Sequence, residues 1–472
     1  MKRKLPEVDP VVLHDIAGMR AGKVIFISLV IIILLLFFLI FMLPGIIKGG
    51  RYIHFSSTLT EVGVYVDDKY IGSTEGSRYF ISSGEHKVTY IKDGSVLKED
   101  TIKISHPIFF TLLIHYKADI DVDIKGDSTI FERSYNRRLQ EAVLYSAITD
   151  YDEYYNYKPI FTYLAKDAIS CGINDVSNQF KTLVAFVNSN EMKADLDNAI
   201  AILNENNIIY NSSDFDKLYA LLDSYLAANS EINTTIANAV VIPTANGSFY
   251  TYPSTEFTIG KNGSLSSQDA PSLPLTLTVP SFSISGNMVS EYEYALFVEA
   301  NPYWAKSNRE TLIEDGVVDE YYLEGIYLTT STRSEKPIRN ISYYAAKAYI
   351  DYLNSKDSTY SYRLPTEAEF EVMASSTKDK AYSTSLITVD NDTSMPTSVM
   401  GGLWEFTDSH FVPLARLSDN YSSLTKLDEA DIIIKGGSYI NDPSTISAAS
   451  TGIIEKNTDS EYTGFRVVRE VK

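Results

Sequence analysis

The sequence predicts a multidomain α+β protein with one N-terminal transmembrane helix. Its 472 residues favour two to four domains over a single core. An uncharged apolar run near the N-terminus is followed by period-two alternation, then by apolar residues at three- and four-residue spacing, and then by a loop-rich stretch. These changes of pattern divide the chain into five segments. The predicted segments are a tail at 1–23, a membrane helix at 24–47, a β module at 50–125, a helical spacer at 126–240 and a C-terminal domain at 245–472.

The apolar run from Val24 to Ile47 contains no charged side chain. A helix of this length, at about 1.5 Å per residue, exceeds a ~30 Å hydrocarbon core. A cleaved signal peptide is the competing interpretation, but the run is too long and no small-residue cleavage site follows it. The sequence therefore predicts a transmembrane helix.

Basic residues lie mainly before this helix. Because cytoplasmic flanks carry the excess of Lys and Arg, the tail is expected in the cytoplasm and the later domains in the periplasm or outside the cell. This orientation describes a single-pass inner membrane protein. The basic residues before the run are Lys2, Arg3, Lys4, Arg20 and Lys23, and those closely after it are Lys48 and Arg51.

Composition excludes several classes of function. The formal charge of −20 repels polyanions, so nucleic acid is not an expected partner. Cys171 is the only cysteine, which excludes an internal disulfide and a cysteine zinc cluster.

The segment after the membrane helix alternates apolar and polar residues in "VGVYVDDKYIGST" and "ISSGEHKVTYIKDG". Asp67-Asp68 and Gly84 interrupt the alternation, which predicts short antiparallel strands joined by tight turns. The stretches "VYVDDKYIGST" and "SSGEHKVTY" resemble a PEGA domain, a small β module of bacterial surface and envelope proteins, although Asp68 stands where that family has a turn glycine. The residues from His106 predict a further strand of this module.

The next segment predicts four or five helices. Stretches such as "ERSYNRRLQEAVLYSAITDYDEYY" and "SDFDKLYALLDSYLAAN" place apolar residues three and four apart, with Ser and Asp at N-cap positions. We interpret this segment as a helical spacer.

From Ile242 the chain has the pattern of an irregular α+β domain with long connections. Seven stretches in this part resemble, in order, the motifs of the formylglycine-generating, sulfatase-modifying enzyme family. This resemblance implies a modified C-type-lectin fold with a twisted β core and two helices. The stretches are "FTIG", "PSFSISGNMVSEYEYALFV", "KPIRNISYYAAKAYIDYLN", "YRLPTEAEFEVMAS", "MGGLWEFTDSHF", "IIIKGGSYIN" and "GFRVVRE".

Several motif residues have expected structural roles. Thr366 and Glu369 have the spacing of a capping box at a helix start. Arg363 and Arg466 are expected to be buried or half-buried guanidiniums that pair with carboxylates, since only Arg offers a planar fork for two such bonds. The expected partners are Glu367, Glu369 or Glu405.

Two further pairs of motif residues concern packing. Gly436 and Gly437 are expected to let a strand pass close to another backbone. Trp404 and Phe465 are expected to lie in the core.

Enzymes of the family hold copper with two cysteines between the G-G-S and G-F-R motifs. In this chain the matching positions are Ile446 and Thr451, which cannot bind soft Cu(I) as thiolates do. A related branch holds iron with three histidines, but His410 is the only histidine after Tyr250. Neither known route to oxidation is therefore expected, and whether the chain is an enzyme stays uncertain.

The resemblance also implies a calcium site beside the G-N-V-W-E-W motif. Its matching oxygen donors are Gly401, Leu403 and Glu405, while an asparagine ligand of the family is replaced by Ser398. The alternative role of Glu405 is an ion pair with a buried arginine. Calcium is the only cofactor that the sequence suggests.

The leading hypothesis is a non-catalytic envelope protein that binds a ligand or partner through its degenerate C-terminal domain. The ligand face would consist of loops 321–337 and 441–462, and the partner would be a glycan, peptidoglycan-associated material or another envelope protein. One alternative is an enzyme with an unfamiliar mechanism based on carboxylates such as Glu367, Asp408 and Glu461. Another is a structural component of an envelope complex, with Tyr-rich helices as docking surfaces.

Overall fold

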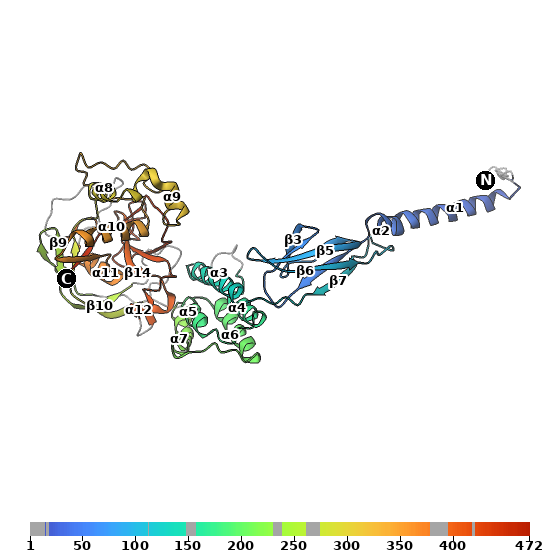
Figure 1. Ribbon diagram of the computed structural model, residues 1–472, viewed down its shortest axis with the longest axis horizontal. Helices are drawn as coiled ribbons and strands as arrows, with labels where there is room; N and C mark the ends of the chain where they lie inside the picture. Colours follow the sequence, from blue (N-terminus) through green and yellow to red (C-terminus); the bar gives the residue numbers. More distant parts are fainter. Residues whose placement is uncertain are drawn as a thin grey trace, which may run out of the picture. The chain divides into compact units, whose positions relative to one another are not determined.

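The structure is a computed structural model, and it describes residues 15, 18–111, 113–147, 157–229, 238–260, 274–377, 395–417 and 421–472. The chain forms two compact units, one with Met1–Ser134 and Lys166–Ile173 and the other with Tyr135–Ala165 and Asn174–Lys472. Figure 1 follows the elements along the chain. Most of the predicted tail 1–23, including Lys2, Arg3 and Lys4, lies outside the described residues.

The apolar run is helical, as predicted. It consists of α1 (Ala21–Phe37), the π-helical turn η1 (Phe38–Met42) and α2 (Leu43–Lys48). Together these span 28 residues with a mean hydropathy of 3.6 in the apolar window, and none of that window is buried. By length and composition this helix can cross a membrane.

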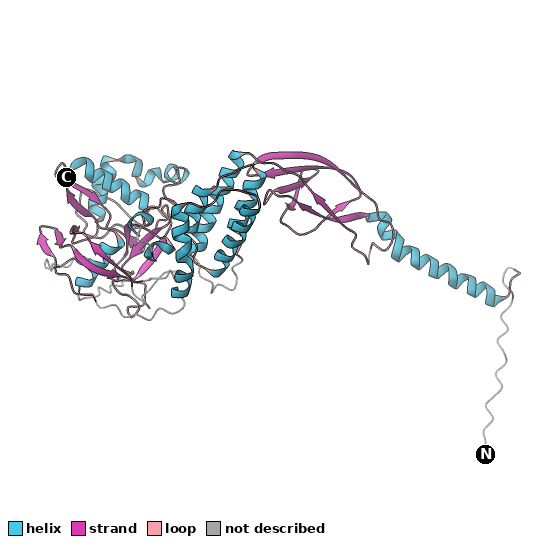
Figure 2. Cartoon of the chain, turned by 90° about the horizontal axis from the view of Figure 1, so that it is seen from below, coloured by secondary structure: helices cyan, strands magenta, loops and turns pink. Residues whose placement is uncertain are grey.

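Two sheets follow the helix (Figure 2). One has the strand order β4-β1-β7 and the other has the order β3-β2-β5-β6. Asp67 and Asp68 have φ values of 50° and 63° and connect β2 to β3, which confirms the predicted tight turn. The strands are β1 (Gly50–Ser56), β2 (Gly63–Val66), β3 (Lys69–Ser73), β4 (Tyr79–Ser82), β5 (Gly84–Lys92), β6 (Ser95–Ile104) and β7 (Lys117–Asp121).

Two predictions for this part are wrong in detail. Gly84 is not a hairpin turn, because it is the first residue of β5, and the preceding strand β4 pairs in a different sheet. The described residues from His106 to Tyr116 do not form a strand, and the next strand, β7, begins at Lys117. Apolar residues in this stretch instead contact the apolar helix, where the Phe110 amide donates to the Phe41 carbonyl oxygen at 2.7 Å. Whether this module is a PEGA domain stays a prediction.

The described residues of the predicted spacer, 126–147, 157–229 and 238–240, contain five helices. Their apolar residues form buried faces because they recur at helical spacing, and Ser189 caps α6 by accepting from the Met192 amide. The helices are α3 (Ser128–Ala147), α4 (Ile160–Ser170), α5 (Ser177–Val184), α6 (Asn190–Glu205) and α7 (Ser213–Asn229).

Where the structure describes the C-terminal part, it has three sheets and short helices joined by long loops, as predicted. The strand orders are β10-β11, β13-β18-β12-β9-β8 and β16-β15-β14-β17. The strands are β8 (Thr244–Asn246), β9 (Phe249–Tyr252), β10 (Thr255–Ile259), β11 (Leu275–Val279), β12 (Phe282–Ser285), β13 (Tyr360–Arg363), β14 (Trp404–His410), β15 (Ile432–Lys435), β16 (Thr451–Ile454), β17 (Thr463–Gly464) and β18 (Val468–Val471). The helices are α8 (Glu291–Ala300), η3 (Pro302–Trp304), η4 (Lys306–Asn308), α9 (Arg309–Glu314), α10 (Tyr343–Lys356), α11 (Glu367–Ser376), η5 (Pro413–Leu417) and α12 (Tyr421–Leu424).

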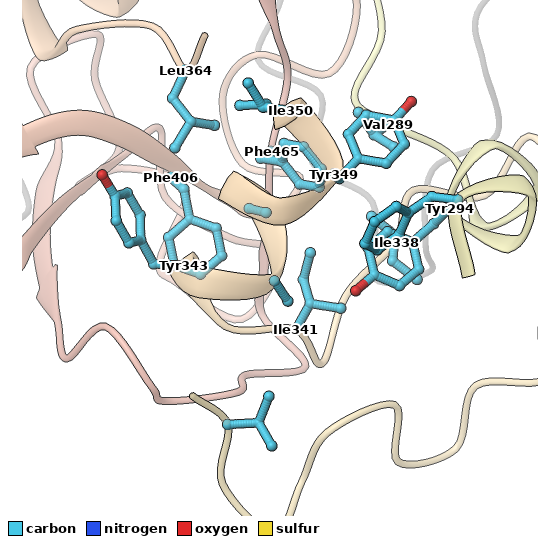
Figure 3. Packing of buried hydrophobic residues seen from close by; sticks show 14 of the residues in the cluster. Val289, Tyr294, Ile338, Ile341, Tyr343, Tyr349, Ile350, Leu364, Phe406 and Phe465 are labelled. Carbon is cyan, nitrogen blue, oxygen red and sulfur yellow. The ribbon is translucent and has the colours of Figure 1, made fainter. Parts of the chain in front are cut away.

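The core of this part lies between α8, α10 and the strand β14. Figure 3 shows Tyr349 packed beside Phe465, and Phe406 beside Tyr343. Trp404 and Phe465 are both buried in this cluster, as predicted.

The glycine pair also has its predicted role. A Cβ on Gly436 would lie 2.7 Å from the carbonyl oxygen of Val399, and both glycines have positive φ, so the two segments could not approach this closely with larger residues.

Candidate functional site

Helix α11 carries the residues around which the candidate site is built. The Thr366 hydroxyl accepts from the Glu369 amide and the Glu369 carboxylate accepts from the Thr366 amide, which confirms the capping box. Three glutamates of this helix are buried, and each pairs with a cation from a different element. Buried charges must be paired because an isolated one loses its hydration. The pairs are Glu367 with Arg416, Glu369 with Arg363 and Glu371 with Lys435.

Arg363 makes the bidentate pair that its motif predicts. Its two terminal nitrogens donate to the two oxygens of Glu369 at 2.7 and 2.6 Å, and its Nε donates to Glu470 at 2.7 Å. The Arg363 side chain is 29% exposed, so water reaches this pair. The interaction holds the start of α11 against β13 and β18.

Arg466 and Glu405 form a fully buried ion pair. Arg466 donates from Nε and Nη2 to the two Glu405 oxygens at 2.5 and 2.6 Å. Its other N–H groups donate to the carbonyl oxygens of Ser285, Gly286 and Thr397. All five donors of the guanidinium therefore have an acceptor. This confirms the ion pair that was the alternative role of Glu405.

Lys435 occupies the buried space beside Thr451, one of the two positions that match the copper-binding cysteines of the family. Its Nζ donates to Glu371 at 2.7 Å, to the Thr451 hydroxyl at 2.8 Å and to the Ala449 carbonyl at 3.1 Å. The remaining Glu371 oxygen accepts from the Gly260 amide at 2.9 Å. Since an ammonium has three donors, Lys435 is satisfied, and Thr451 serves as its acceptor.

Ile446 stands at the other position that matches a copper-binding cysteine of the family, and it belongs to the hydrophobic core. It is buried in a cluster with Phe370 and Val399. A Cβ on Gly437 would lie 3.0 Å from Ile446 Cγ1, so the second glycine of the pair makes room for this side chain. Both positions therefore have structural partners.

Glu367 lies in a second buried polar group. Its carboxylate accepts from Arg416 at 2.7 Å and from the Tyr421 hydroxyl. Burial opposes ionisation of Glu367, but the positive charges of Arg416 and Lys435 outweigh this effect and lower its pKa. Burial and the adjacent carboxylate raise the pKa of Tyr421 well above its usual value. Glu367 is therefore an ion and Tyr421 a neutral donor at neutral pH.

Glu367, Arg416 and Tyr421 line a small cavity that is partly open to solvent. His410 also lines it, and its Nδ1 lies 2.5 Å from the Leu427 carbonyl oxygen. A carbonyl accepts only, so Nδ1 carries the proton and Nε2 is the acceptor in the neutral ring. Burial lowers the pKa of His410, which keeps the ring neutral. The cavity lining includes Glu367, His410, Arg416, Tyr421, Ile433 and Thr451.

The two segments predicted as a ligand face share bonds at their bases. The Asp319 amide donates to Asp459 at 2.7 Å, and the Asp459 amide donates to Asp319 at 3.0 Å. Asn340 bridges the same region, since its amide donates to the Ser460 carbonyl and its side chain to the Glu324 carbonyl. The loop bases are therefore adjacent.

The exposed parts of these segments are smaller than predicted. Segment 441–462 is not one open loop, because Thr451–Ile454 forms strand β16 and begins with two buried residues. Segment 321–337 is more open, and Tyr327 in it is 86% exposed.

The residues of the predicted calcium site lie together at the start of β14. Gly401 has a φ of 76°, and Leu403 and Glu405 are buried. Both Glu405 oxygens already bind Arg466, so a cation there would meet a guanidinium, and the donor set fits an ion pair better than calcium. Calcium binding stays an untested prediction.

The carboxylates of the enzyme alternative have separate partners. Glu367 binds Arg416, Asp408 accepts from Lys347 at 3.0 Å, and Glu461 lies 3.8 Å from Arg339. Among the described residues, no group of three or more His, Cys, Asp or Glu side chains could hold a metal ion.

Sequence reasoning missed two cations of the site. Lys435 had a signal, because it stands where the family motif R-G-G-S-W has its arginine. Arg416 had none, since it pairs with Glu367 across 49 residues without a motif around it.

Comparison with known proteins places the C-terminal part in a family. The family model of the sulfatase-modifying factor enzyme 1-like domain matches residues 228–397 and 397–471. An uncharacterized protein of Borreliella burgdorferi is 26% identical over 400 residues, which cover 78% of this chain and 79% of that protein.

Two solved structures are also similar to this chain. PvdO from Pseudomonas aeruginosa is 18% identical with a TM-score of 0.35, over 47% of this chain and 94% of that one. Treponema denticola variable protein 1 is 15% identical with a TM-score of 0.31, over 49% and 99%. The match to the family model covers more than half of the residues, and the chain therefore belongs to the sulfatase-modifying factor enzyme 1-like family.

Proposed function

We propose that this protein is a membrane-anchored binding module of the bacterial envelope. In this proposal the apolar helix crosses the inner membrane with the tail in the cytoplasm. The C-terminal domain keeps the scaffold of its family and binds a ligand in place of oxidising a thiol.

The observation that carries this proposal is the set of partners at the two positions that match the copper-binding cysteines of the family. Thr451 accepts from Lys435, which Glu371 neutralises, and Ile446 packs in the core. A buried ammonium beside Thr451 also disfavours a bound cation. These contacts support a structural use of the space that the active enzymes use for chemistry.

The proposed ligand face comprises the open loop 321–337 and the exposed residues beside it. Tyr327 is exposed there, and Tyr side chains supply large contact areas with little loss of conformational freedom. The bonds of Asp319, Asp459 and Asn340 hold the loop bases in place, which supports a preorganised face. The proposed ligand is a glycan or an envelope protein.

Photocrosslinking tests this proposal in cells that carry the full chain. A benzophenone amino acid replaces Tyr327 in one variant and Ile209, an exposed residue of the helical segment, in the control. We expect a discrete adduct from Tyr327 and none from Ile209, and digestion by protease or by glycosidase then identifies the ligand as protein or glycan. The proposal is wrong if the two positions give the same pattern.

A further inference from the structure

We propose that residues 107–114, of which the structure describes all but 112, form a second membrane-contacting element, which enters the lipid bilayer beside the apolar helix. This inference rests on the membrane anchor proposed above. The element, called here the lipid loop, connects β6 to β7 and has the sequence "PIFFTLLI".

The lipid loop is joined to the apolar helix by its backbone. The Phe110 amide donates to the Phe41 carbonyl oxygen at 2.7 Å, and the Phe110 ring lies 5.1 Å from the Phe41 ring and 6.2 Å from the Phe37 ring. A Cβ on Gly45 would lie 2.1 Å from the Ile108 carbonyl oxygen, so the two backbones touch there. The lipid loop is therefore in direct backbone contact with the apolar helix, and we expect it to lie in the same environment as the helix residues that it contacts.

The depth of this contact follows from helix geometry. Phe41 lies 17 residues after Val24, which is about 26 Å along the helix and less than the ~30 Å thickness of a hydrocarbon core. If the core instead ends at Ile47, Phe41 lies about 9 Å inside it. In either alignment the Phe41 carbonyl, and the Phe110 amide bound to it, lie within the hydrocarbon region.

The chemistry of the lipid loop suits that environment. Residues 105–116 carry no Asp, Glu, Lys or Arg, and the loop exposes several large apolar side chains. The amides of Phe110, Leu113 and Ile114 have backbone acceptors, which reduces the cost of placing these three groups in an apolar solvent. The exposed apolar side chains are Ile108, Phe109, Leu113 and Ile114.

A tyrosine and an arginine lie where the loop would leave the bilayer. The Tyr116 hydroxyl donates to the Phe109 carbonyl at 3.0 Å, and Arg51 lies over the Tyr116 ring at 5.8 Å. Tyr and Arg favour the level of the lipid headgroups. We infer that the occupant of this surface is lipid acyl chain, and that the loop fixes the β module at the membrane surface.

Fluorescence quenching in vesicles tests the inference with the full chain. In a Cys171→Ala background, a single cysteine labelled with an environment-sensitive dye replaces Leu113, Leu34 in the apolar helix, or Val96. Val96 is an exposed apolar control eight residues before Ile104 on β6, about 26 Å along the strand from the loop. The protein is reconstituted into phosphatidylcholine vesicles that contain acyl-chain spin-labelled lipid.

We expect quenching at Leu113 that approaches quenching at Leu34 and is several-fold stronger than at Val96. Quenching at Leu34 with none at Leu113 overturns the lipid loop alone and assigns the surface to a protein partner. Absence of quenching at Leu34 overturns the membrane anchor itself, and the inference falls with it. As a second check, Gly45→Leu should separate the loop from the helix and reduce quenching at Leu113 while leaving Leu34 unchanged.

Discussion

Replacement of Arg466 by alanine should strongly destabilise the C-terminal domain. The change leaves the Glu405 carboxylate buried without its two charge-assisted bonds, and it removes the donors to three backbone carbonyls. Breaking one partner of a fully buried ion pair costs about 3–5 kcal/mol. Arg363→Ala should cost less, about 1–3 kcal/mol, because water reaches that pair and Glu369 keeps its bond from the Thr366 amide.

Urea denaturation of the full chain in detergent measures this difference. The only tryptophans, Trp304 and Trp404, lie in the C-terminal part, so their fluorescence reports the unfolding of that part. A double replacement, Arg466→Met with Glu405→Leu, should recover much of the loss because no charge is left unpaired. Values below about 0.5 kcal/mol for Arg466→Ala would mean that the guanidinium is solvated and that the reasoning about this motif is wrong.

Three further predictions concern buried charges. Lys435→Met should cost about 3–5 kcal/mol because Glu371 loses its cation, whereas Thr451→Ser, which keeps a hydroxyl acceptor, should be nearly neutral in the same urea assay. Burial and the neighbouring Asp319 raise the pKa of Asp459 to about 9, so the folded state retains a proton that the unfolded state releases near 3.8. The free energy of unfolding should therefore fall as the pH rises from about 4 to 9. In thermal melts, Asp459→Asn should reduce this dependence on pH. EDTA should leave the melting temperature unchanged, because Arg466 occupies both oxygens of Glu405. If EDTA lowers the melting temperature and calcium restores it, the calcium site that the resemblance implies is present.

Local patterns allowed much of the fold to be predicted from the sequence. The capping box of α11 and the tight turn at Asp67-Asp68 depend on neighbouring residues, and the structure contains both. The motif arginines were predicted to pair with carboxylates because a buried guanidinium requires them, and Glu369 and Glu405 are those carboxylates.

Long-range pairing could not be predicted in the same way. Glu367 binds Arg416 of η5 and Tyr421 of α12, and no sequence motif surrounds either residue. Only the folded chain brings these residues together. The run after His106 was predicted as a strand because it is apolar. This run contacts Phe41, which lies more than sixty residues earlier in the sequence, and no periodicity of the sequence indicates that contact.

The central claim is that this member of the family keeps the scaffold and has lost the oxidation. The most direct measurement incubates the purified full chain with Cu(I), oxygen and a cysteine-containing sulfatase peptide, and then uses mass spectrometry to detect loss of the thiol and gain of an aldehyde. An active formylglycine-generating enzyme serves as the positive control, and Cu(I) binding by the variant Ile446→Cys with Thr451→Cys checks that the two positions are matched correctly. We expect no aldehyde from the native chain, and copper-dependent turnover by it would contradict the account.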